Sequence, residues 1–272
     1  MTAKSGTCTR IITGICIVAV LSLAIWLGPV TRILFFYALI FFGSREMSDA
    51  LNRLDLRTTP WIARALTAIH AALFYFDCSP VFHYSAIALV LIVSLVIGLF
   101  RRFRVIDLCA SFAICFYPCA LFLGFCYLSV QPNEILYPVV ITTLFATSFC
   151  DASAYFFGRW FGKRKLCPAI SPNKTVEGSI AGTVLGTASG ALIWLILRNF
   201  MAVPLYVYVI ASFFCTIAGQ LGDLCASAIK RQTGIKDFSN LFPGHGGAID
   251  RLDSFSFAMP TAFLILALFH AL

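Results

Sequence analysis

The stretch SAIKRQTGIKDFSNLFPGHGGAIDRLD, residues 227–253, is the charged segment around which the chain is organised. A long apolar run precedes it, and a last apolar run follows it. Asp223 lies just upstream. The stretch contains a glycine-rich turn. The ionisable residues of the stretch are Lys230, Arg231, Lys236, Asp237, His245, Asp250, Arg251 and Asp253. Charge concentrated in this way within an apolar chain indicates the functional region.

The composition predicts an integral membrane protein. Of the 272 residues, 60% are hydrophobic and 12% are charged, and the mean hydropathy is +0.90. Soluble domains contain about 45–50% apolar and about 25% charged residues. A chain of this length has room for roughly nine spans of about 20 residues each. We therefore expect one all-α, polytopic membrane domain over 1–272, with the catalytic motifs concentrated in 147–253.

Nine apolar runs can be assigned as transmembrane helices. They cover residues 11–27, 30–42, 62–76, 82–100, 106–129, 135–158, 178–197, 204–229 and 254–272. The second and third runs are short and contain or adjoin an arginine. The charged segment 44–61 between them has helical spacing of its apolar residues, which fits either an interfacial helix or a solvated connector. Acidic residues at the ends of runs, Asp77, Asp107 and Glu134, are expected to be solvated.

The distribution of positive charge predicts the orientation. With the N-terminus inside, all of the 20 Lys and Arg residues except Arg32 and Arg198 fall in inside segments, as the positive-inside rule requires. The expected topology is N-in and C-out, with residues 227–253 on the cytoplasmic side. Because no transit peptide or long tail is seen, we expect a bacterial cell (inner) membrane. Most of the 11 cysteines lie in apolar runs without a CxxC or Cys/His cluster, which favours buried thiols over disulfides or zinc.

The segment 171–190 combines a helix start with a row of glycines. Ser171, Lys174 and Thr175 lie where the helix begins, and outward-pointing N–H groups with a lysine predict an anion site. Helix capping together with positive-inside charge is the alternative interpretation. Pro168 and Pro172 exclude a continuous helix before it. Glycines recur at every fourth position, at Gly178, Gly182, Gly186 and Gly190, which predicts close helix packing or a dimer contact.

Carboxylates near the charged stretch point to metal-assisted chemistry on phosphates. Asp151 lies within an apolar run, where a carboxylate is costly, so it is expected to face a polar pocket or to pair with a basic residue. Asp223 and Ser227 share a helical face, and Asp250 and Asp253 open the last helix. If those helix ends meet, hard oxygen ligands converge beneath basic residues. The basic residues are Lys230, Arg231, Lys236 and Arg251. Magnesium-assisted phosphoryl or nucleotidyl transfer needs this combination.

The turn at residues 243–247, PGHGG, can bring backbone N–H groups close to phosphates. Glycine allows the left-handed conformations of an anion-binding nest, so Gly246 and Gly247 are candidate binding residues. His245 is either catalytic or a structural hydrogen-bonding residue of the turn. No GxxxxGK loop is present, which argues against a Walker-type ATPase.

These motifs resemble those of the phosphatidate cytidylyltransferases (CDP-diacylglycerol synthases). The resemblance is carried by Ser227, Lys230, Arg231, Lys236, Asp237, Pro243, His245, Gly246, Gly247, Asp250, Arg251 and Asp253. The segments 171–178 and 151–159 resemble two further motifs of the family, whereas the N-terminal half matches only as multi-span membrane sequence. Ala248 stands where the family usually has a larger apolar residue.

The resemblance implies an enzyme that joins CTP and phosphatidic acid into CDP-diacylglycerol and pyrophosphate. It also implies a homodimer in the lipid bilayer, with Mg²⁺ or Mn²⁺ held by Asp223 and Asp250 and a monovalent cation such as K⁺ beside it. No nucleic acid is expected as a partner. The expected catalytic residues are Asp223, Asp250, Lys230 and Lys236. The expected substrate-binding residues are Lys174, Ser171, Thr175, Ser227, Arg231, His245, Gly246, Gly247, Arg251 and Asp151.

Two other functions remain possible on the sequence alone. A CTP-dependent polyprenol or phytol kinase would transfer the γ-phosphate and release CDP instead of pyrophosphate. An ion-coupled transporter with Asp151 and Asp223 on its ion path is a second alternative. Transporters often contain structural repeats, and no repeat is evident in this sequence.

Overall fold

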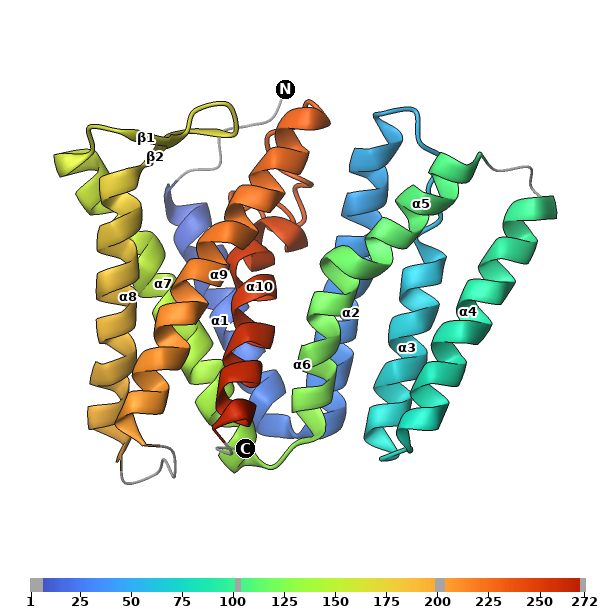
Figure 1. Cartoon of the computed structure of the whole chain (residues 1–272), viewed down its shortest axis with the longest axis horizontal. Coiled ribbons are helices and arrows are strands. Elements are labelled where there is room, and N and C mark those ends of the chain that lie inside the picture. Colours follow the sequence, from blue (N-terminus) through green and yellow to red (C-terminus); the bar gives the residue numbers. More distant parts are fainter. Residues whose placement is uncertain (1–6, 101–103, 199–203, 270–272) are drawn as a thin grey trace. The chain divides into compact units, whose positions relative to one another are not determined.

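A computed structural model describes residues 7–100, 104–198 and 204–269 of the chain (Figure 1). The described residues form α-helices, one π-helical turn and one short β-hairpin. They group into two compact units, each built from two stretches of chain. Unit 1 contains Met1–Val130 and Gln232–Arg251, and unit 2 contains Gln131–Arg231 and Leu252–Leu272. The single domain expected over 1–272 stays a prediction.

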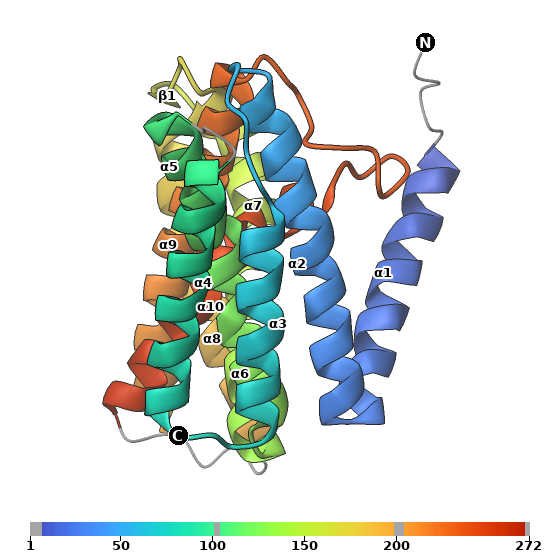
Figure 2. The same ribbon diagram turned by 90° about the vertical axis from the view of Figure 1, so that its right-hand side faces the viewer.

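Unit 1 holds the first helices and the loop that precedes the last one. Its elements are α1 (Thr7–Leu27), α2 (Pro29–Asn52), α3 (Trp61–Tyr75), α4 (Pro80–Phe100), α5 (Val105–Ile114), the π-helical η1 (Cys115–Ala120) and α6 (Leu121–Val130). Helix α2 packs against α1, α3 and α6 (Figure 2). The arginine in α2, Arg32, is buried, and its Nε donates to the Ile25 carbonyl at 2.9 Å. This buried charged side chain is thus hydrogen-bonded to the backbone.

Unit 2 holds the remaining helices and the hairpin. Its elements are α7 (Asn133–Phe161), β1 (Lys165–Cys167), β2 (Ser171–Thr175), α8 (Val176–Leu197), α9 (Leu205–Gln232) and most of α10 (Ala248–Leu268). The strands β1 and β2 are antiparallel and lead directly into α8. The prediction that Pro168 and Pro172 prevent a continuous helix in this segment is therefore confirmed, because the segment forms a hairpin.

The glycine row of α8 packs closely against neighbouring helices, as predicted: Gly178 and Gly182 face α7, and Gly190 faces α9 (Figure 1). A Cβ atom on Gly178 would lie 2.6 Å from the Ala154 carbonyl oxygen, and one on Gly182 would lie 2.8 Å from that of Cys150. Both distances are below any real Cβ contact, so the two backbones approach as closely as only glycine permits. This seam fixes the position of Asp151, on α7, relative to the start of α8.

Five helices are long and apolar enough to cross a membrane, α4, α7, α8, α9 and α10. A sixth span arises if α5 to α6, bent by 42°, is taken as one. Large apolar side chains face outward on these helices, for example Phe100, which is 82% exposed. The chain is therefore a multi-pass membrane protein. The nine predicted runs all fall on helical segments, but the count of nine spans is not confirmed.

The fifth run, 106–129, is not a continuous helix. Pro118 lies inside the π-helical turn, and Tyr117 beside it has extended backbone angles. Proline lacks the N–H that would continue the helical ladder and its ring clashes with the preceding turn, so the run breaks here. The predicted run is therefore two helical segments joined by a bend of 42°, and its assignment as a single span stays a prediction.

Two expectations about polar segments in unit 1 were wrong. Residues 44–52 are the end of α2 rather than a separate interfacial helix or connector, and Met47 there is buried. Asp107, expected to be solvated, is 1% exposed. It accepts hydrogen bonds from the Arg57 backbone N–H at 3.0 Å and from the Arg104 guanidinium at 2.8 Å. It holds the α2–α3 connection against α5.

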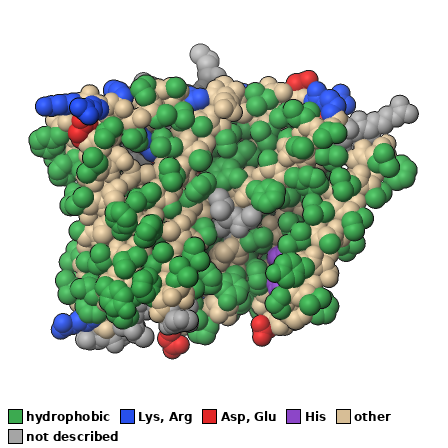
Figure 3. All heavy atoms as spheres, in the orientation of Figure 1, with side chains coloured by type: hydrophobic (Ala, Val, Ile, Leu, Met, Phe, Trp, Pro, Cys, Tyr) green, Lys and Arg blue, Asp and Glu red, His purple; other side chains and the backbone are tan. Residues whose placement is uncertain are grey.

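The structure describes most of the Lys, Arg and Cys residues whose positions the sequence analysis used. Figure 3 shows hydrophobic side chains over the visible face of both units, with Lys and Arg gathered at the hairpin end of unit 2. Lys4, Arg101 and Arg102 lie outside the described residues, and the N-in/C-out orientation stays a prediction. The ten cysteines whose side chains are described are free thiols; Cys119, Cys126, Cys150 and Cys215 are buried as predicted, whereas Cys16, Cys109 and Cys225 are exposed.

Candidate functional site

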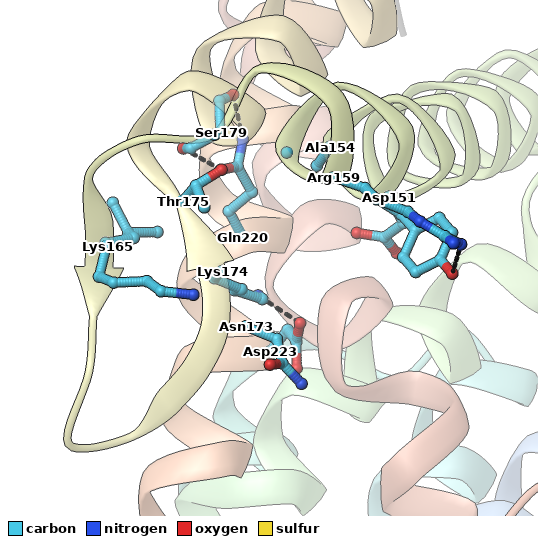
Figure 4. Close-up of a pocket in the computed structure, with 14 residues that line it drawn as sticks. Asp151, Ala154, Arg159, Lys165, Asn173, Lys174, Thr175, Ser179, Gln220 and Asp223 are labelled. Atoms are coloured by element: carbon cyan, nitrogen blue, oxygen red, sulfur yellow. Dashed lines mark hydrogen bonds and ion pairs between the residues drawn. The ribbon is translucent and has the colours of Figure 1, made fainter.

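Unit 2 contains a cavity of about 620 Å³ at its hairpin end (Figure 4). The cavity is lined by the C-terminal part of α7, both strands of the hairpin, the first turn of α8 and the middle of α9. Its volume lies within the range of about 300–1,000 Å³ that is common for small-ligand sites. Four predicted site residues line it: Asp151, Lys174, Thr175 and Asp223.

An ion pair crosses this cavity. The Lys174 ammonium, on β2, contacts Asp223 Oδ2, on α9 (Figure 4). Both side chains are half-buried, with 28% and 26% of their surface exposed. Ser227, one helical turn further along α9, donates its hydroxyl to Asp223 Oδ1 at 3.4 Å. The sequence separates Lys174 and Asp223 by 49 positions, and the fold joins them.

Negative charge concentrates around Asp223. Asp151, on α7, and Asp253, in the first turns of α10, both interact electrostatically with the Asp223 carboxylate, which repels them. The positive charge of Lys174 attracts the Asp151 carboxylate, and that of Lys230 attracts the Asp253 carboxylate, so both lysines oppose this repulsion. Repulsion between carboxylates in a partly desolvated site is unfavourable, so this cluster favours a bound cation. The predicted location of Asp151 in a polar pocket is confirmed.

The hairpin is held in place by interactions of the first turn of α8. Thr175 is the residue before the helix, and its hydroxyl oxygen accepts the Gly178 N–H at 3.1 Å. Glu177 accepts the backbone N–H groups of Lys163 and Arg164 at 3.0–3.2 Å. Thr175 is therefore a helix cap, which was the alternative interpretation, and it also lines the cavity. These bonds place Lys174, the residue before the cap, at the cavity wall.

Two predicted binding residues at this end make structural contacts. The Arg231 guanidinium Nε donates to the Ile170 carbonyl at 3.2 Å and so ties α9 to the hairpin turn. Ser171 is the half-buried first residue of β2. Within the described residues, neither lines the cavity.

A polar network behind the cavity was not predicted. Gln220, one turn before Asp223 on α9, accepts the Ser179 hydroxyl through Oε1. Its Nε2 donates to Thr183 Oγ1 at 2.9 Å and to Cys150 Sγ at 3.3 Å. Both Gln220 and Ser179 line the cavity. The sequence did contain a signal for this network, because Gln220 is an amide within an apolar run, three residues before Asp223.

The remaining predicted residues belong to unit 1, on the loop that leads into α10. Lys236 and Arg251 are exposed. His245 is half-buried, and its Nδ1 has no hydrogen-bond partner among the described residues. Gly246 has a positive φ of 86°, which the glycine prediction anticipated. Whether His245 is catalytic or structural stays a prediction.

Asp250 is buried and caps its own helix. Its Oδ2 accepts the backbone N–H of Gly247 at 2.9 Å and that of Phe238 at 2.8 Å. A third-position carboxylate that accepts the N–H of the residue before the helix is half of a capping box. Asp250 therefore shapes the PGHGG turn, a structural function that the metal-ligand prediction did not include.

The donor set of unit 2 fits a divalent cation. Mg²⁺ in nucleotide sites is bound by one or two carboxylates together with substrate phosphates and water. Asp223 and Asp151 supply hard oxygen donors at one cavity, and Lys174 already compensates charge at Asp223. Within the described residues, no three His, Cys, Asp or Glu side chains are arranged as a complete protein cage. The role of Asp250 as a second ligand stays a prediction.

Comparison with known proteins identifies the family. The model of the "Cytidylyltransferase family" matches residues 8–269. A protein named phosphatidate cytidylyltransferase from Bacillus subtilis (strain 168) is 46% identical over 119 residues, 44% of each chain. One of the same name from Staphylococcus saprophyticus is 40% identical over 144 residues, so these two matches span about half the length of each relative. The namesake from Staphylococcus haemolyticus (strain JCSC1435) is 32% identical over 258 residues, 91% of this chain and 96% of the relative. The chain belongs to the cytidylyltransferase family.

Proposed function

We propose that this chain transfers the cytidylyl group of CTP to phosphatidic acid, forming CDP-diacylglycerol and pyrophosphate. Family membership and the names of the relatives support this assignment. The structural observation that carries it is the cavity of unit 2, where Lys174 pairs with Asp223 beside Asp151. Cations and carboxylates in one partly desolvated cavity are the groups that a phosphate-transfer site requires.

The reaction is a displacement at the α-phosphorus of CTP. An oxygen of the lipid phosphate forms the new P–O bond, and the bond from the α-phosphorus to the bridging oxygen of the β-phosphate breaks, so pyrophosphate leaves with the electron pair. The second pKa of a phosphate monoester is about 6, so the attacking oxygen is already ionised and needs no general base. The protein therefore acts by positioning the reactants and by neutralising charge.

Residues of unit 2 can be given roles in this reaction. Lys174 binds phosphate oxygens of the nucleotide, and Lys165, whose side chain points toward Lys174 in Figure 4, adds a second cation at the same wall. Thr175 and Glu177 hold the hairpin that presents both lysines. Asp223, with Asp151 beside it, would hold Mg²⁺ or Mn²⁺, which would supply positive charge to offset that of the phosphates. A monovalent cation such as K⁺ is proposed beside it.

The location and assembly of the enzyme are part of the same proposal. The distribution of Lys and Arg supports a site on the cytoplasmic side, where CTP is available, and we propose a bacterial cell membrane. Phosphatidic acid then reaches the site laterally from the bilayer. The family resemblance supports a homodimer. A thiol reagent that does not cross membranes, applied to a single-cysteine variant at Asn173, tests the sidedness.

Substitution of Asp223 tests the proposed site. Asp223→Asn keeps the shape of the side chain and removes its charge, so we expect formation of lipid-linked nucleotide to fall at least about 100-fold. Glu134→Gln, an exposed acid at the start of α7, is the matched control and should keep wild-type activity. Both variants should unfold at the same temperature as the wild type. Asp223→Asn with nearly full activity would refute the assignment.

A further inference from the structure

Glu46 is a buried acid in unit 1 that no motif of the sequence analysis included. It lies on α2, beyond the apolar run 30–42, and is 5% exposed. Its Oε1 accepts the Ser239 hydroxyl at 2.6 Å and the Ala248 N–H at 2.8 Å, and its Oε2 accepts the Ile249 N–H at 2.9 Å. Both oxygens are therefore used by residues about 200 positions later in the chain.

The partners of Glu46 are the first N–H groups of α10. Ala248 and Ile249 are the first two residues of that helix, where N–H groups have no carbonyl partner within the helix. A carboxylate at this end also interacts favourably with the helix dipole. None of the ion pairs in the described part of the chain involves Glu46. Burial raises the pKa of Glu46, and the three hydrogen bonds oppose that rise. Both carboxylate oxygens thus accept hydrogen bonds from the loop or from the start of the helix.

Close packing shows that this contact is built into the loop. A Cβ atom on Gly247 would lie 2.5 Å from Glu46 Oε1, so a larger residue there would have to displace the carboxylate from its hydrogen bonds. From the other side, Asp250 holds the N–H groups of Gly247 and Phe238. The turn between them is closed by the Phe242–Gly246 bridge and by the His245 N–H, which donates to the Phe242 carbonyl at 2.8 Å. Glu46 and Asp250 together leave this turn little conformational freedom.

We infer that Glu46 is a positioning residue for the PGHGG turn of unit 1, which the sequence predicts to bind phosphates. Its carboxylate fixes the turn that carries His245, Gly246 and Gly247 to the start of α10. Because it is buried and both of its oxygens are occupied, it acts through these residues and does not touch substrate. The inference rests on the proposed function, together with the sequence-based prediction that Gly246 and Gly247 of this turn bind phosphates of the nucleotide.

Glu46→Gln is the variant that tests the inference, with Asp49→Asn as the matched control. Glutamine keeps the volume of the side chain but replaces one acceptor oxygen with an NH₂ group that opposes a backbone N–H. Asp49 lies on the same helix, is 66% exposed and pairs only with Arg45 at 3.8 Å. Hydrogen exchange is measured by mass spectrometry on peptides covering 239–250, and the Michaelis constants for CTP and phosphatidic acid are measured separately.

For Glu46→Gln we expect exchange in 239–250 to become about 10- to 100-fold faster, the effect of losing a hydrogen bond to a charged acceptor. The KM for CTP should rise by roughly 10-fold or more, with the KM for phosphatidic acid within about 2-fold of wild type. Asp49→Asn should change neither. Unchanged exchange, or faster exchange with unchanged CTP kinetics, would overturn the inference. Hydrogen exchange is measured without turnover, so it tests the contact of Glu46 independently of activity. If the proposed function is wrong, the wild-type protein itself forms no lipid-linked nucleotide.

A second pair of variants tests the contact if Glu46→Gln does not fold. Gly247→Ala alone should damage CTP kinetics and loop protection, because its methyl group collides with the carboxylate. In a Glu46→Ala background that collision is absent, so adding Gly247→Ala should cause little further loss. Strong non-additivity of this kind is expected of residues in direct contact. Simple additivity of the two losses would contradict the inference.

Discussion

Gly182→Ala tests whether the α7–α8 seam positions the cavity. The added Cβ would lie 2.8 Å from the Cys150 carbonyl oxygen and 3.1 Å from Ala154 Cβ. Ordinary contacts begin at 3.4 Å, so the helices must separate by about 0.6 Å, the difference between 3.4 Å and 2.8 Å. Asp151 is the residue after Cys150, so the separation moves Asp151 away from the wall that carries Lys174.

The expected magnitude combines two opposing effects. Alanine is a better helix former than glycine by about 1 kcal/mol. Overpacking a well-packed contact costs about 1–3 kcal/mol. Gly182→Ala should therefore lower the free energy of unfolding by up to about 2 kcal/mol. Gly124→Ala, on α6, is the control, because no described atom lies within 4 Å of its added Cβ. It should gain up to about 1 kcal/mol, which makes the two variants differ by about 1–3 kcal/mol.

The assay combines stability, local exposure and activity. Unfolding in mixed detergent micelles gives the free energies, and peptide mass spectrometry after thiol labelling reports whether the buried Cys150 becomes reactive. A misplacement of this size should lower kcat/KM by roughly 10- to 100-fold. If Gly182→Ala and Gly124→Ala shift stability equally, and Cys150 stays unlabelled, the seam does not have the role described here.

Three further predictions concern other residues and the cation. Lys174→Met should raise the KM for CTP by about 10-fold or more, since a phosphate contact is lost, and an unchanged KM would refute its assigned role. Asp107→Ala should lower the free energy of unfolding more than Asp49→Ala, because it removes the acceptor of the Arg57 N–H and of the Arg104 guanidinium, whereas Asp49→Ala should change it by less than about 0.5 kcal/mol; equal effects in denaturant titrations would contradict this. Excess chelator should abolish activity and added Mg²⁺ or Mn²⁺ should restore it, so full turnover in chelator would exclude the proposed cation.

Helices and their close contacts were the most predictable part of the fold. Nine apolar runs fall on helical segments, because an uninterrupted apolar run in a membrane must satisfy its own backbone hydrogen bonds. The period-four glycines of α8 identified its packing face. The break at Pro118 could have been expected from the proline alone. The end of α2 could not, because its polar residues Ser44, Glu46 and Ser48 are buried by contacts with distant segments, which periodicity does not report.

The cavity was predictable in its residue types but not in all of its pairings. Lys174, Asp151 and Asp223 were recognised because charge is costly in an apolar chain. Their meeting depends on the hairpin and on the α7–α8 seam, which are tertiary features. Glu46 was missed because it stands among other charged residues at the end of a helix. Only the structure shows that, unlike its exposed neighbour Asp49, it is buried against a loop about 200 residues away.

Transfer of labelled nucleotide to lipid tests the central claim most directly. Purified protein is incubated with CTP labelled at the α-phosphate, phosphatidic acid and Mg²⁺, and the mixture is extracted with organic solvent. The proposed displacement at the α-phosphorus predicts that the label enters the lipid phase while one equivalent of pyrophosphate appears in water. Label that remains in water as CDP, with phosphate added to a lipid acceptor, would contradict it.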